Sequence, residues 1–164
     1  MKQLFLFFFL LLSIPFNTSA ISLDELQDNP QQYQMVDQSS KYAFFVDSGS
    51  IESLRYSPPY YTLKCTAYYV NYLKGLIILI NINVNYDISH QYFTPTKRKM
   101  SELGIYTSGH IEDIWSFNGN FQSSSPFFNN KDGAINSSAY HIANYLFYKA
   151  YDEYYGPKFG ITLY

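Results

Sequence analysis

Cysteine is almost absent from this chain. The only one is Cys65, so no internal disulfide can form and packing alone must stabilise the folded domain. Cys65 lies between Leu63 and Ala67 in an alternating segment, which places its thiol on the apolar side of a predicted strand. We therefore expect Cys65 to be buried and chemically inert rather than a nucleophile.

Charged residues are also few, at 15% of the chain. The longest basic run is Lys97-Arg98-Lys99, and 13 acidic residues slightly outnumber 11 basic ones. Binding to nucleic acid depends on a concentrated basic surface. We therefore expect no nucleic acid partner.

Only one long apolar run occurs, and it lies at the N-terminus. Lys2 precedes nine consecutive Leu and Phe residues, Leu4 to Leu12. A helix that spans a bilayer needs about 20 apolar residues, and strongly polar sequence follows this shorter run. The pattern predicts a signal peptide over residues 1–20, cleaved after Ala20, and no transmembrane segment after its removal.

The signal peptide predicts an exported protein in the periplasm, at the cell surface or outside the cell. No cysteine adjoins the cleavage site, so lipid attachment there is not expected. Behind the leader we expect a polar N-terminal segment over residues 21–31 and a single domain over residues 32–160. In the polar segment, Ser22 to Glu25 is spaced like a helix capping box, which predicts at most one helical turn before Pro30.

Aromatic residues are abundant, with 18 Tyr and 14 Phe. One interpretation is a strand-rich fold, because aromatic side chains favour strands. The other is an exposed binding face, because Tyr offers rigid amphipathic contact area at low entropic cost. The best candidate for such a face is the Pro58-Pro59 turn with Tyr56, Tyr60 and Tyr61 around it; the alternative for these tyrosines is packing at a sheet edge.

Alternating apolar and polar residues predict antiparallel strands along most of the domain. The pattern is clearest from Leu76 to Tyr86, where apolar residues at every second position face away from Asn81, Asn83 and Asn85. We expect this strand to form a hairpin with the one before it. The predicted strands cover Tyr33–Val36, Tyr42–Val46, Ile51–Tyr56, Tyr60–Lys74, Leu76–Asp87, a short segment around Lys97–Met100, and Ile111–Phe117 with Ile111, Trp115 and Phe117 on one side.

A single helix is predicted near the C-terminus. Apolar residues recur at helical spacing from Ala139 to Tyr154, Ser137 or Ser138 can cap the start, and Gly156-Pro157 can end it. The fold class is therefore α+β: an antiparallel β-sheet meander with one C-terminal α-helix packed on its apolar face. His141 is isolated on this helix, and we expect it to be partly exposed or hydrogen-bonded.

Motifs that would indicate catalysis are missing, including a Gly-x-Ser-x-Gly elbow, a phosphate loop and a dinucleotide fingerprint. The nearest approach to a metal site is Asp87 with His90 and His110 with Glu112, which two neighbouring strands could bring together. The alternative is that these side chains are exposed or singly hydrogen-bonded at strand ends. No recognised metal spacing is matched, so we expect no cofactor and no enzymatic activity.

The segment Tyr33 to Val36, followed by Tyr42 to Ile51, resembles the opening hairpin of the bacterial surface-adhesin protein E family. The later layout of antiparallel strands and a C-terminal helix is also similar. The resemblance implies a bacterial envelope protein with a sheet-plus-helix fold and, for some members, binding to host matrix or plasma proteins. This chain departs from the family in having no lipid-attachment cysteine and no second cysteine for a disulfide between helix and sheet.

Our leading hypothesis is an exported envelope or cell-surface protein that works by binding, adhesin-like and without catalysis. It would use the tyrosines from Tyr56 to Tyr61 or an exposed sheet edge, and its partner would be a protein, for example one on a host surface; a homodimer is a further option. The second hypothesis is a metal-dependent enzyme or metal-binding periplasmic protein. A third is a structural or chaperone-like subunit whose partner covers a sheet edge.

Overall fold

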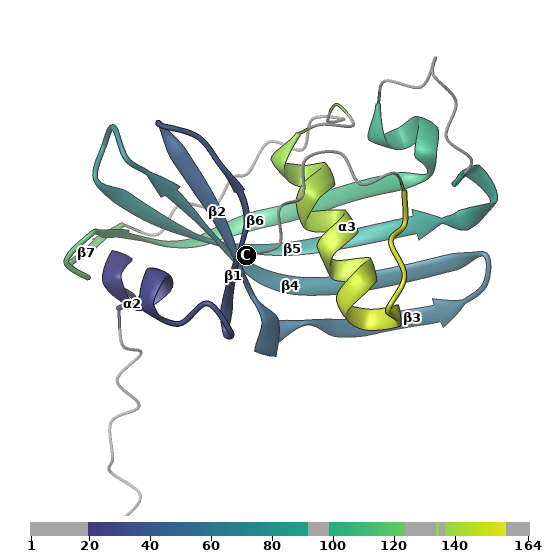
Figure 1. Ribbon diagram of the computed structural model, residues 1–164, viewed down its shortest axis with the longest axis horizontal. Coiled ribbons are helices and arrows are strands. Elements are labelled where there is room, and N and C mark those ends of the chain that lie inside the picture. The colour runs from purple at the N-terminus through teal and green to yellow at the C-terminus, as the bar shows by residue number, and fades with distance from the viewer. Residues whose placement is uncertain (1–19, 92–98, 124–133, 135–136, 157–164) are drawn as a thin grey trace, which may run out of the picture.

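A seven-stranded antiparallel sheet forms the body of the described chain, and helix α3, Ser138–Tyr151, lies across one of its faces (Figure 1). The computed structural model describes residues 20–91, 99–123, 134 and 137–156. The predicted α+β fold with a C-terminal helix on an antiparallel sheet is confirmed. The predicted signal peptide, apart from Ala20, lies outside the described residues.

The other elements follow the predicted order. A short helix, α2, spans Leu23–Asp28. The strands are β1 (Tyr33–Gln38), β2 (Tyr42–Asp47), β3 (Glu52–Ser57), β4 (Tyr60–Asn71), β5 (Leu76–Asp87), β6 (Ile105–Ser116) and β7 (Phe121–Ser123). No helix among the described residues is both long enough and apolar enough to span a membrane.

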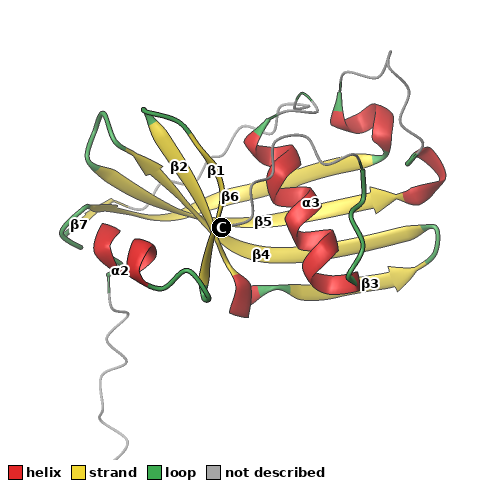
Figure 2. Ribbon diagram, in the orientation of Figure 1, coloured by secondary structure: helices red, strands yellow, loops and turns green. Residues whose placement is uncertain are grey.

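The sheet departs from a simple meander because β4 has two partners on the same side. β3 pairs with the first part of β4, residues 60–64, and β2 pairs with the last part, residues 67–71. β1 lies outside β2, whereas β5, β6 and β7 follow on the other side of β4 (Figure 2). The predicted β4–β5 hairpin is confirmed, and β1 and β2 also pair as an antiparallel hairpin. The strand order differs from that of the predicted meander because β4, with 12 residues, is long enough to pair with two shorter strands.

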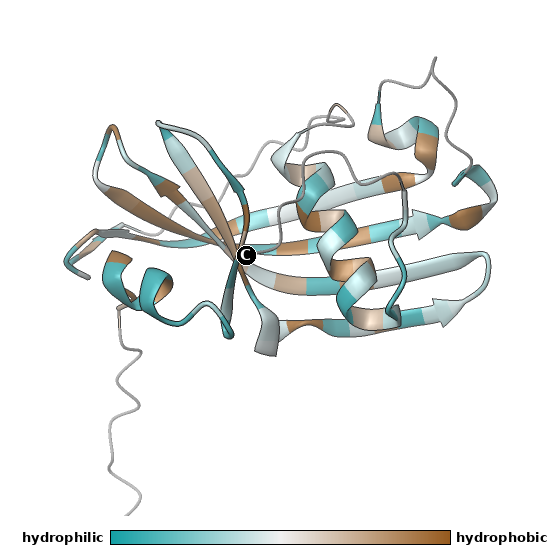
Figure 3. Cartoon of the chain, in the orientation of Figure 1, coloured by the Kyte–Doolittle hydropathy of each residue, from teal (hydrophilic) through white to brown (hydrophobic). Residues whose placement is uncertain are grey.

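β5 is hydrophobic throughout its first five residues, Leu76 to Ile80, and alternates between apolar and polar residues from there to Asp87 (Figure 3). Ile80 and Ile82 belong to a first core on the face that α3 covers. Ile77 belongs to a second core on the opposite face, nearer the start of the strand. The long strands therefore supply apolar side chains to two cores on opposite faces of one sheet.

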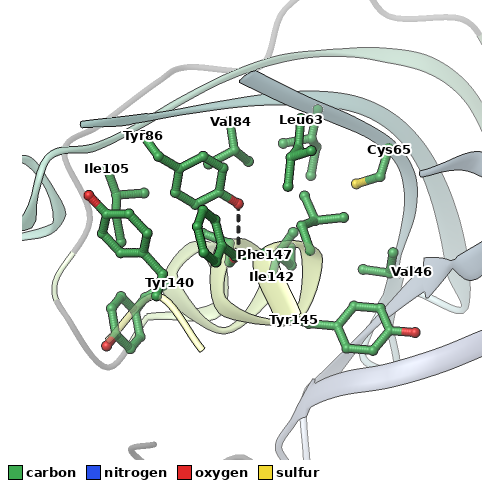
Figure 4. Packing of buried hydrophobic residues seen from close by; sticks show 14 of the residues in the cluster. Val46, Leu63, Cys65, Val84, Tyr86, Ile105, Tyr140, Ile142, Tyr145 and Phe147 are labelled. Atoms are coloured by element: carbon green, nitrogen blue, oxygen red, sulfur yellow. Dashed lines mark hydrogen bonds between the residues drawn. The ribbon is translucent and has the colours of Figure 1, made fainter. Parts of the chain in front are cut away.

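The first core lies between α3 and the sheet (Figure 4). Ile142 and Leu146 of α3 pack in one cluster with Ile80 and Ile82, so the helix lies on the apolar face of the sheet, as predicted. The Tyr86 ring is also buried there, and its hydroxyl donates a 2.7 Å hydrogen bond to the backbone carbonyl of Ala143. The polar atom of this buried ring is thus satisfied, and the bond joins β5 to the middle of the helix.

The second core is covered by α2, which is longer than predicted. The Ser22 hydroxyl accepts a 3.1 Å hydrogen bond from the Glu25 amide, so the predicted cap is confirmed. The helix nevertheless has six residues, nearly two turns rather than at most one. It extends because Leu26 is fully buried among residues that include Ile77 and Trp115. Local spacing indicated the cap but not this tertiary contact.

β6 begins earlier than predicted and changes register along its length. The segment Met100–Leu103, at the end of the predicted Lys97–Met100 strand, forms a 3₁₀ helix, and residues 92–98 lie outside the described part. Between Ile111 and Ile114 the pairing with β5 shifts by a bulge. Ile111 therefore packs against the first core while Trp115 enters the second, so the prediction that they share a side is wrong.

The ends of α3 are set by local chemistry. Ser137 caps the start by accepting a 3.4 Å hydrogen bond from the Tyr140 amide, as predicted. The helix ends at Tyr151, earlier than predicted, because Asp152 adopts a left-handed conformation with φ 57° and its amide bonds back to the Tyr148 carbonyl.

Candidate binding site

The tyrosines around the Pro58-Pro59 turn do not form one cluster. In the β3–β4 hairpin, Tyr56 pairs with Tyr61, and Ser57 pairs with Tyr60. Because neighbouring residues of a strand point to opposite faces, Tyr56 and Tyr61 lie on the α3 side and Tyr60 on the other. The three predicted binding residues are therefore divided between the two faces of the sheet.

On the α3 side, Tyr56 is exposed but held in place by other rings. Its side chain is 68% exposed, whereas Tyr61 beneath it is only 8% exposed. The Tyr56 centroid lies 5.2 Å from Tyr61, edge to face, and 5.6 Å from Tyr151 of α3. Tyr61 in turn contacts Phe147 at 5.6 Å, which ties these rings to the first core. We call Tyr56 and Tyr151 the aromatic patch.

The backbone of β3 is less suited to adding a further strand. β3 is a sheet edge that pairs, among the described strands, only with β4. Its pairing shifts by a bulge between Ser53 and Arg55, and Pro58-Pro59 follows directly after it. Bulges and prolines are devices that protect edges from strand addition. Recognition here would therefore use side chains, among which Leu54 is 50% exposed.

Tyr60 belongs to the opposite, uncovered face of the sheet. Its side chain is 46% exposed, and the Arg55 guanidinium lies 5.0 Å from its ring centroid. Beside it, β4, β5 and β6 carry polar side chains. We call this surface the polar sheet face; it consists of Tyr60, Thr62, Lys64, Thr66, Asn81, Asn83, Asn85, Tyr106, Ser108, His110 and Glu112.

Hydrogen bonds join part of the polar sheet face across three strands. Thr66 donates to the Asn81 amide oxygen at 3.1 Å, and the Asn81 amide nitrogen donates to Glu112 at 2.7 Å. His110 lies 2.6 Å from the same carboxylate oxygen. Hydrogen bonds from His110 first, and then from Asn81, lower the pKa of the Glu112 carboxyl.

The four residues of the metal hypothesis form two separate pairs. His90 lies 3.1 Å from Asp87, and His110 pairs with Glu112. His110 stands opposite Asn81, six residues before Asp87 on β5, which is roughly 20 Å along the strand at about 3.3 Å per residue. The described residues contain no group of three or more His, Cys, Asp and Glu side chains that could hold a metal. The fold thus does not bring the two pairs together.

The Asp87 pair has a local structural role. Asp87 accepts a 3.0 Å hydrogen bond from the Ser89 amide and caps the 3₁₀ turn Ile88–His90. Hydrogen bonds from Ser89, followed by His90, lower the pKa of the Asp87 carboxyl. Capping of this turn is a sufficient structural reason for an aspartate at position 87.

Cys65 is buried in the first core, as predicted. Burial raises the pKa of its thiol to about 12, so the reactive thiolate is scarce at neutral pH. This environment does not activate a nucleophile.

Sequence reasoning missed a polar cluster where α3 begins against β1. Ser138 donates a 2.5 Å hydrogen bond to Asp37, and the Tyr42 hydroxyl lies 3.4 Å from the same carboxylate oxygen. His141, whose side chain is 11% exposed, has its Nδ1 3.5 Å from the other Asp37 oxygen. Asp37 lies between serine and histidine, so the histidine does not contact the serine hydroxyl as a general base must. The cluster joins residues 101 positions apart, and no local pattern indicated it.

A small pocket lies beside this cluster, between α3 and the sheet. Its lining includes Phe44, Ile82, Thr107, Ala139 and Ile142, and its volume is about 50 Å³. Small-molecule sites usually measure about 300–1,000 Å³. The pocket is therefore too small to serve as a substrate cleft.

Comparison of the chain with protein-family models, with curated proteins and with solved structures finds no match.

Proposed function

We propose that this chain is an exported, non-enzymatic binding protein that recognises a protein partner through the aromatic patch. The observation that carries the proposal is the state of Tyr56: it is 68% exposed, yet its ring contacts both Tyr61 and Tyr151. An aromatic side chain that is already ordered loses little conformational entropy when a partner covers it. Tyrosine is also one of the residues that dominate binding energy at protein interfaces.

The surroundings of Tyr56 support the same role. The strand that carries Tyr56 also exposes an apolar side chain at its bulge, Leu54. The Ser53 hydroxyl and the Tyr151 hydroxyl lie 3.0 Å apart at the margin, where they can exchange hydrogen bonds with a partner. An apolar centre with a polar rim is the usual anatomy of a protein interface.

The experiment measures binding of the purified exported chain to a panel of purified extracellular-matrix and plasma proteins by biolayer interferometry. The panel follows from the resemblance to surface-adhesin proteins. We expect at least one partner whose affinity falls about tenfold or more with Tyr56→Ser, a loss of about 1.4 kcal/mol. Phe121→Ser is the matched control, because Phe121 is 60% exposed on β7, away from the patch.

Two results would contradict the proposal. One is the absence of binding to every member of the panel. The other is a partner whose affinity is unaffected by Tyr56→Ser, or affected equally by Phe121→Ser. Self-association lost with Tyr56→Ser would instead assign the patch to a homodimer and refute recognition of a different protein.

A further inference from the structure

We propose that the polar sheet face binds a neutral oligosaccharide, independently of the proposed function at the aromatic patch. The face covers β4, β5 and β6 on the side away from α3, and no described helix lies over it (Figure 1). α2 covers the same face only at the other end of the sheet, over the second core. The described helices thus leave this polar part of the sheet uncovered.

The open groups at one end of this face are amides and hydroxyls. The Asn83 side chain is exposed and makes no hydrogen bond to another described residue. The Asn85 oxygen accepts a 2.8 Å hydrogen bond from Thr62, which leaves its amide nitrogen available as a donor. Ser108 stands opposite Asn83 on β6 and adds a hydroxyl. Together they offer both donors and acceptors, the set that sugar hydroxyl groups require.

The charges on the face are largely paired with one another. Lys64 lies 3.7 Å from Glu52, and His110 lies 2.6 Å from Glu112. Arg55 lies over the ring of Tyr60. Opposite charges on this face therefore largely balance one another, although the side chains stay exposed, and this balance favours an uncharged, polyhydroxylated ligand over an anionic polymer.

Two exposed tyrosines flank these amides. Tyr60 stands opposite Asp87 on one side of β5, and Tyr106, 52% exposed, stands opposite Asn85 on the other. Two strand spacings and a two-residue offset separate their backbones by roughly 12 Å. The negative ring face of Tyr106, and the face of Tyr60 that Arg55 does not cover, can attract the slightly positive C–H groups of a sugar ring. The spacing suits a short chain of sugars better than a single one.

The test is an NMR titration of the isotope-labelled exported chain with four soluble hexasaccharides: cellohexaose, chitohexaose, xylohexaose and mannohexaose. We expect one of them to shift the side-chain amide signals of Asn83 and Asn85 together with the backbone signal of Tyr106. Tyr106→Ala and Asn83→Ala should each raise the Kd about tenfold. Because both side chains are exposed, thermal melting of each variant should match that of the wild type and show that it is folded.

Phe121→Ala and Asn118→Ala are the matched controls, since they remove an exposed aromatic ring from β7 and an exposed amide from the turn between β6 and β7, and neither should change the Kd. Tyr56→Ser should also leave sugar binding unchanged, which separates this proposal from the proposed function. Failure of all four sugars to shift the named signals would overturn it. Shifts confined to other residues would also overturn it. In a parallel titration with heparin, binding of heparin alone that disappears with added salt would indicate an anionic ligand and would likewise overturn it.

Discussion

Truncation of Leu146 tests whether α3 holds the domain together. The side chain is fully buried in the first core, on the face of α3 that packs against β5. Burying a leucine contributes about 1.5–3 kcal/mol, and the cavity left by Leu→Ala raises the total cost to about 2–5 kcal/mol. A domain of this size has a free energy of unfolding of about 5–15 kcal/mol, and no disulfide adds to it. Leu146→Ala should therefore remove a large share of the stability.

The assay is thermal and urea denaturation followed by far-UV circular dichroism. At about 2–4 °C of melting temperature per kcal/mol, Leu146→Ala should lower the melting temperature by roughly 5–15 °C. Leu146→Asp places a carboxylate in the same position and should prevent accumulation of folded protein. Lys149→Ala is the control, because Lys149 is exposed on the same helix, and it should change stability by no more than about 0.5 kcal/mol. A Leu146→Ala variant as stable as Lys149→Ala would refute the docking of α3.

Three further outcomes are expected. Cys65 should react with a thiol reagent only after denaturant is added, since it is buried and its pKa is raised to about 12; rapid labelling of the native protein would reverse its assignment to the core. The exported protein should begin at Ile21 by N-terminal sequencing, and recovery of an intact Met1 in the membrane fraction would rule out cleavage. Hydrogen bonds lower the pKa of the Glu112 carboxyl in the folded protein. The ionised carboxylate therefore stabilises the fold at pH values above the pKa of Glu112 in the unfolded chain, and this stabilisation is lost as the pH falls through its pKa in the folded protein. His110→Ala should raise the Glu112 pKa in an NMR titration of the carboxyl carbon, and an unchanged value would contradict the hydrogen-bonded pair.

The parts of the fold that rest on short-range periodicity were predictable. The alternation of residues in β5 predicted which side chains face the core. The helical spacing in α3 predicted an apolar face, and Ile142 and Leu146 on that face pack with Ile80 and Ile82. The helix caps at Ser22 and Ser137 could also be predicted, because each capping side chain is only three residues from the amide that it bonds.

The parts of the fold that depend on contacts between segments far apart in the sequence could not be predicted. A bulge in β6 moves Trp115 to the opposite face from Ile111, and its position depends on the pairing with β5. The division of Tyr56 from Tyr60 follows from the register of the β3–β4 hairpin. Proximity along the chain suggested one tyrosine cluster, but the period of two in a strand separates neighbours.

β5 supplies side chains to both cores, so it links them mechanically. Ile80 and Ile82 lie in the first core and Ile77 in the second, on one strand bonded to β4 and β6 along its length. If either core melts, the strand shared with the other core loses part of its packing, so we expect the two cores to unfold in one step. The backbone amides of β5 should accordingly exchange with solvent only when the whole sheet opens.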